Sequence, residues 1–124
     1  MLKLVGSETY DLVYKIAGEK EDECPVFKLK KLSSGNMNDI DDQLTTMSRE
    51  AGGNITLLVG TQRKLKIKYA LVSWVNVADS KGKVSGCTDE AKELLPIEVQ
   101  DFLEKNIDDV NAIKGVGIKE TKNS

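Results

Sequence analysis

A chain of 124 residues has the usual length of a single domain and buries roughly two-thirds of the surface that its unfolded form exposes. Because 40% of the residues are apolar and 31% are charged, the composition excludes wholesale disorder. The 20 acidic and 18 basic side chains leave a net charge of −2, which excludes a general electrostatic attraction to nucleic acid.

The opening residues do not follow the pattern of a signal peptide, and no apolar run approaches the roughly 20 residues of a membrane-spanning helix. We therefore expect a cytoplasmic protein that does not enter a membrane. Its two cysteines, Cys24 and Cys87, are far apart in the sequence, and their spacing does not support a disulfide.

The first third of the chain predicts two strands, residues 10–16 and 26–32, joined by an acidic turn into a hairpin. In the second strand apolar residues alternate with lysines, as in a strand with one face in water. A helix is then expected to run to about Arg49, capped by Asn36 or Asn38. Its apolar residues recur every three or four positions, at Met37, Ile40, Leu44 and Met47.

The middle of the chain is harder to interpret. Residues 55–59 are apolar and β-branched and follow a Gly-Gly-Asn turn, which predicts a buried strand. Residues 64–77 fit two patterns, because their apolar positions alternate as in a strand and also form a helical stripe. Propensity favours the strand, and the helix stays open. Trp74, the single tryptophan, is interpreted as an anchor of the core.

The C-terminal part is predicted to be helical. After a turn at residues 78–83 and a short extended piece at 84–87, Thr88 is expected to cap a helix over residues 89–95. Pro96 then suits the first turn of a last helix. The apolar stripe of that helix consists of Val99, Phe102, Leu103, Ile107, Val110 and Ile113.

These elements predict an α+β fold, in which a small antiparallel sheet has helices packed on one side and the C-terminal part is helical. We expect one domain over residues 1–118, with its last helix closed by Gly115 and Gly117. Residues 119–124 are expected to form a polar tail.

The chain contains no histidine, which excludes a catalytic triad and a conventional zinc site. The acidic run Asp39-Ile40-Asp41-Asp42 lacks the glycine and glutamate that shape a calcium loop. It and the pair Asp108-Asp109 are interpreted as solvated carboxylates. We expect no metal, no cofactor and no enzymatic activity; a hydrolase or lyase would need a deep pocket with a carboxylate of raised pKa.

Several stretches together form a recognisable pattern: Pro25-Val26-Phe27-Lys28-Leu29-Lys30-Lys31-Leu32, residues 71–79, the turn through Gly82, Thr88-Asp89-Glu90, Leu94-Leu95-Pro96, the amphipathic helix with Phe102 and Ile107, and Lys122-Asn123-Ser124. The chain thereby resembles small proteins of tailed bacteriophages and prophages, particularly tail assembly chaperones. The resemblance implies a helper for hydrophobic tail components, or a minor structural part of the virion, in the host cytoplasm or the particle. It also implies a helix where the strand-like run begins at Lys64.

Two sets of site residues follow. If the stripe of the last helix is partly exposed, Phe102, Leu103, Ile107 and Val110 are expected to bind partners, either other tail or virion proteins or further copies of the chain. The alternative function is a nucleic-acid-binding regulator that uses the cations of residues 63–68, namely Arg63, Lys64, Lys66 and Lys68. The simpler interpretation of that run is a solvated face over a buried one, which makes nucleic acid an unlikely partner.

Overall fold

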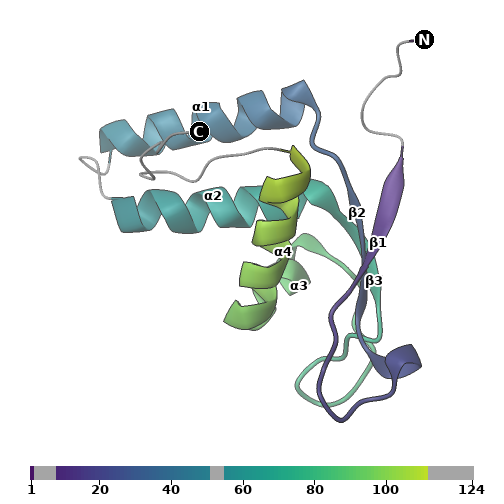
Figure 1. Ribbon diagram of the computed structural model, residues 1–124. Helices are drawn as coiled ribbons and strands as arrows, with labels where there is room; N and C mark the ends of the chain where they lie inside the picture. Colours follow the sequence, from purple (N-terminus) through teal and green to yellow (C-terminus); the bar gives the residue numbers. More distant parts are fainter. Residues whose placement is uncertain (2–7, 51–54, 112–124) are drawn as a thin grey trace.

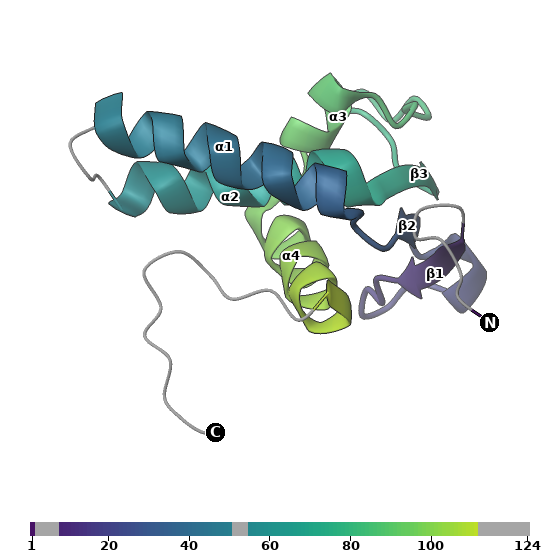
Figure 2. The same ribbon diagram turned by 90° about the horizontal axis from the view of Figure 1, so that it is seen from above.

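The computed structural model of the chain describes residues 1, 8–50 and 55–111, and Figures 1 and 2 show a small sheet with helices on one of its faces. The strands lie antiparallel in the order β1-β2-β3. The α+β prediction is confirmed, whereas Ile113, Gly115, Gly117 and the tail lie outside the described residues. The elements are β1 (Thr9–Val13), the 3₁₀ turn η1 (Glu21–Glu23), β2 (Val26–Lys30), α1 (Ser34–Glu50), α2 (Ile55–Ala70), β3 (Leu71–Val75), α3 (Asp89–Glu93) and α4 (Ile97–Asn111).

The core lies between the sheet and the helices. Phe27 and Leu29 of β2 are buried and pair with Trp74 and Leu71 of β3, so these side chains share the inner face. The Trp74 ring meets Phe27 edge-on with centroids 6.2 Å apart, and its Nε1 donates a 2.8 Å hydrogen bond to the carbonyl of Ser85. Trp74 is therefore the core anchor that the sequence predicts.

The predicted hairpin is confirmed, and α1 begins earlier than predicted. The Asn36 backbone N–H donates to Ser33 Oγ at 3.1 Å, while the Ser33 N–H donates to Asn36 Oδ1 at 3.2 Å. These reciprocal bonds make Ser33 the N-cap. Asn36 takes part as the third residue of the helix, and Asn38 lies within it.

The predicted strand over residues 55–59 is wrong, because these residues form the first turns of α2. The ambiguous stretch is helix up to Ala70 and strand from Leu71, so each interpretation holds for one part of it. The buried face of α2 includes Gln62 and Lys66. These two polar residues interrupt the apolar pattern with which a buried helix face is recognised in a sequence. The β-propensity of the neighbouring residues was then the stronger signal, and it favoured a strand.

The connection from β3 to α3 contains the predicted turn, with Gly82 at a φ of 84°. Ala78 and Val84 pair across it as an isolated antiparallel bridge, at the start of the extended piece predicted over residues 84–87. The Thr88 cap is confirmed, since its Oγ1 accepts a 3.0 Å hydrogen bond from the Ala91 N–H. The helix that it begins ends at Glu93.

Asn76 links the end of β3 to the β1–β2 connection. Its φ is 62°, in the left-handed region, and its side-chain amide donates to the carbonyls of Asp22 at 3.0 Å and Cys24 at 2.9 Å. Asparagine tolerates this backbone conformation better than most residues, and here it also supplies two hydrogen bonds.

We predict that Asn76→Ala lowers the free energy of unfolding by about 2 kcal/mol, because it loses both hydrogen bonds and places a Cβ in the left-handed region. Asn76→Gly keeps the backbone conformation accessible and should cost about 1 kcal/mol. Urea denaturation measures both values. Equal losses in the two variants would contradict a role for the backbone conformation.

Candidate functional site

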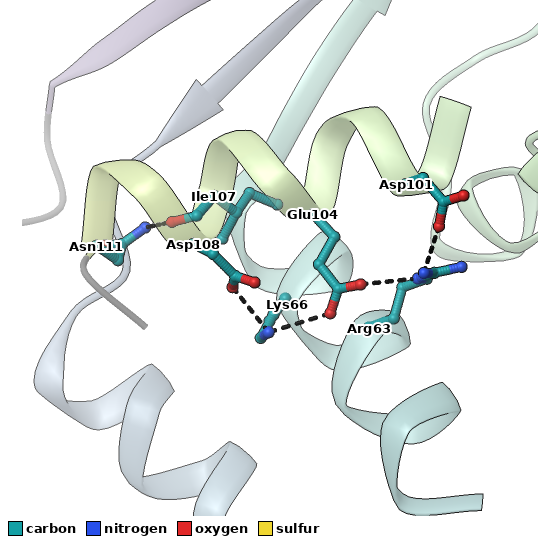
Figure 3. A network of polar contacts seen from close by, with 7 residues as sticks. All are labelled: Arg63, Lys66, Asp101, Glu104, Ile107, Asp108 and Asn111. Carbon is teal, nitrogen blue, oxygen red and sulfur yellow. Dashed lines mark hydrogen bonds and ion pairs between the residues drawn. The ribbon is translucent and has the colours of Figure 1, made fainter. Parts of the chain in front are cut away.

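The basic run of residues 63–68 lies on α2 and faces carboxylates of α4. Arg63 Nε donates to Glu104 Oε1 at 2.9 Å, and its guanidinium also pairs with Asp101 (Figure 3). Lys66 Nζ donates to Glu104 Oε2 at 3.0 Å and lies 2.7 Å from Asp108 Oδ1. We call these five residues the α2–α4 ion cluster.

Lys66 is buried inside this cluster, with 1% of its surface exposed. A charge in such a place needs partners, and the carboxylates of Glu104 and Asp108 supply them. The interpretation of the basic run as a solvated face is therefore wrong for Lys66. Of the other predicted nucleic-acid contacts, Lys64 pairs with Glu93 at 3.3 Å, and Lys68 is exposed with Nζ 5.7 Å from the centre of the Tyr69 ring.

Asp108, interpreted from the sequence as a solvated carboxylate, instead packs against Lys66. Asp108 Oδ1 and Lys66 Nζ are at ion-pair distance, but their geometry is not that of a hydrogen bond. Burial raises the pKa of the Asp108 carboxyl above its ordinary value, and Lys66 acts in the opposite direction. Neighbouring Glu104 and Asp109 add to the increase.

We predict that Lys66→Met lowers the free energy of unfolding by about 3 kcal/mol, because it leaves two carboxylates without their shared cation. The matched control is Lys64→Met on the same helix, where the ion pair with Glu93 is exposed, and it should cost less than about 1 kcal/mol. Urea denaturation compares the two. Similar losses would show that the ion cluster does not support the fold.

The raised pKa of Asp108 makes stability depend on pH. A carboxyl whose pKa is higher in the folded chain favours folding fully below the ordinary aspartate pKa of about 4, and this contribution is lost as pH rises through the raised value. Wild type should therefore lose stability with rising pH relative to Asp108→Asn, which stays neutral. Urea midpoints between about pH 4 and pH 7 test this. Exposed Asp41 on α1, as Asp41→Asn, controls for the removal of one charge, and a trend of the opposite sign would refute the assignment.

The predicted partner-binding stripe of α4 is largely internal. Leu103 and Ile107 have no exposed surface, so in this fold they are core residues and not surface contacts. Phe102 is partly buried and meets Tyr14 edge-on at 5.0 Å between ring centroids. Val110 is 38% exposed. Because α4 packs against α2, its apolar face completes the core.

Exposed apolar side chains gather instead around the short helix α3. A hollow of about 390 Å³ lies between the end of β3, the loop after it and the α3–α4 connection. We call it the α3 hollow. Leu94 at its rim is 83% exposed, and Val84 and Ile97, next in sequence to lining residues, are exposed as well. The apolar lining consists of Trp74, Val77, Ala78, Ala91, Leu94, Leu95 and Pro96.

Sequence reasoning missed this hollow, although one signal was present. Leu94 and Leu95 are neighbours directly before Pro96, so both cannot face the same core. Leu95 is buried and Leu94 is in water. An exposed leucine beside an apolar hollow can bind an apolar side chain of another molecule, but it supplies no acid, base or nucleophile.

A second cleft, of about 280 Å³, lies between α2 and α3. Of the charges that line it, Lys64 pairs with Glu93 and Lys92 with Asp89, while Lys68 lies beside the Tyr69 ring. Lys92 is buried there, and its Nζ donates to the Lys68 carbonyl at 3.1 Å and to Asp89 at 3.2 Å. Near Lys92, burial raises the pKa of the Cys87 thiol, which keeps it protonated at neutral pH. Both Cys87 and the buried Cys24 are free thiols.

Among the described residues, no group of three or more Cys, Asp or Glu side chains is placed to hold a metal ion. Within the same residues, every helix is too short or too polar to span a bilayer. Comparisons of the chain with protein-family models, with curated proteins and with solved structures return no match.

Proposed function

We propose that this chain is a non-catalytic protein of phage or prophage virion assembly, acting as a tail assembly chaperone or a minor structural component. In this proposal it binds an apolar segment of another tail or virion protein at the α3 hollow. It works in the host cytoplasm, and a structural component stays in the particle.

One observation carries the proposal. Two of the stretches on which the phage resemblance rests, residues 71–79 and Leu94-Leu95-Pro96, are separate in sequence but line the same hollow. The first contributes Trp74 and Val77, and the second contributes Leu94, which is exposed, together with Leu95 and Pro96. Because two separate stretches of the resemblance line one surface, they support the use of that surface for the function that the resemblance implies.

The energetics of the hollow also favour a protein partner. Leu94 and Ile97 leave their apolar surface in water, and covering one such side chain completely is worth about 1.5–3 kcal/mol. The hollow is lined on one side by Trp74, which is held by its hydrogen bond to Ser85. Because Trp74 is already held in place, an apolar side chain of a partner can pack beside it and Leu94 at a small cost in conformational entropy.

The alternative functions find less support. A nucleic-acid site needs cations free to meet phosphates, whereas Arg63 and Lys66 are neutralised by α4. A carboxylate enzyme needs an acid of raised pKa in a pocket. Asp108 has the raised pKa, but it lines neither the α3 hollow nor the neighbouring cleft.

The test is co-expression with the tape measure and tail tube proteins of the same phage. We predict that the wild-type chain raises their soluble yield, and that Leu94→Asp weakens the purified complex at least about tenfold, which corresponds to about 1.4 kcal/mol. The matched control is Val110→Asp, an exposed apolar residue on α4, which should bind like wild type. Undiminished binding by Leu94→Asp would exclude the α3 hollow as the site.

A further inference from the structure

The face of the sheet that points away from the helices carries an ordered pattern of side chains, which follows from the strand register. Strand register places Val13 opposite Val26 and Val26 opposite Val75, so the three valines form one row across all three strands. Directly opposite residues in an antiparallel sheet point to the same face, and this is the face opposite buried Phe27. We call these residues the valine row.

The next row on the same face is charged. Asp11 of β1 lies opposite Lys28 of β2, with 3.9 Å between Oδ1 and Nζ, and both side chains are exposed. Val75, at the end of the valine row on β3, is 56% exposed. The outer face thus has an apolar row beside a row with opposite charges on neighbouring strands.

We propose that this outer face pairs with the outer face of a second copy of the chain. A two-fold axis parallel to the strands and midway between β1 and β2 stacks β1 of one copy on β2 of the other. Each row then meets its own counterpart, so Val13 packs on Val26 of the other copy. Aligned packing of two sheets, with strand directions within about 30° of each other, is the usual arrangement.

Charge complementarity selects this axis. It brings Asp11 of each copy against Lys28 of the other, which forms two ion pairs across the interface. An axis over β2 would instead place Lys28 against Lys28. An isologous interface needs a surface that complements itself, and the combination of the valine row with the Asp11–Lys28 row meets that requirement.

The size of the face sets the strength of the dimer. With this axis β1 and β2 of each copy overlap and β3 lies outside the contact. Two strands about 4.8 Å apart with five residues of about 3.3 Å each offer roughly 160 Å² per copy. Stable interfaces bury about 800 Å² per partner, so this contact is weak and reversible. We expect a dissociation constant on the order of 100 μM.

Sedimentation equilibrium of the full chain from about 10 μM to about 1 mM measures the self-association. Val13→Lys should weaken it at least about tenfold, because the substitution places a charge where Val13 packs on Val26 of the other copy. Val110→Lys on α4 is the matched control and should associate like wild type, as should Leu94→Asp in the α3 hollow. A wild type that stays monomeric, or association that Val13→Lys leaves intact, would overturn the proposal.

A mixing experiment identifies the charge pairing independently of any one variant's folding. Asp11→Lys alone and Lys28→Asp alone should each associate at least about tenfold more weakly than wild type, since each brings like charges together across the axis. Mixed in equal amounts, they should form a heterodimer, because position 11 of one then meets position 28 of the other with opposite charge. Failure of the mixture to associate more strongly than either variant would refute the axis.

Discussion

The buried ammonium group of Lys66 sets a constraint on the rest of the structure. A charge with 1% of its residue surface exposed needs counter-charges, and α4 supplies them from successive turns at Glu104 and Asp108. These two carboxylates are four residues apart and both pair with the one ammonium group on α2. Together they fix the rotation of α4 about its axis and its position along α2. Leu103 and Ile107, each preceding one of these carboxylates, are thereby directed into the core.

That constraint extends to the proposed binding surface. With α4 held against α2, the α3–α4 connection at Pro96 lies beside β3, where it lines the α3 hollow with Trp74. Lys92 adds a second attachment, since its ammonium group donates to the carbonyl of Lys68 near the end of α2. The hollow is therefore built on a fixed frame of polar contacts, and its exposed leucine is the C-cap residue of the short helix α3.

Local patterns predicted local structure well and distant pairings poorly. The hairpin, the Thr88 cap and the helical stripe of α4 were readable because each depends on neighbouring residues. The helix α2 was not, because Gln62 and Lys66 occupy its buried face, and the carboxylates that neutralise Lys66 lie 38 and 42 residues further on. For the same reason Leu103 and Ile107 looked available for binding, and the exposure of Leu94 became visible only once the fold had assigned Leu95 to the core.

The two proposed surfaces have a combined consequence. The α3 hollow is lined by Trp74 of the inner face of the sheet and the valine row lies on the outer face, so pairing of two copies through their outer faces leaves both hollows open. A partner that contains several apolar segments along its length then meets two sites on one dimer, and its second contact forms at an effective concentration in the millimolar range. At that effective concentration two weak contacts are enough to keep the partner bound to the dimer, while each contact can still dissociate separately. A protein that must bind an apolar tail component and later release it gains both properties from this arrangement.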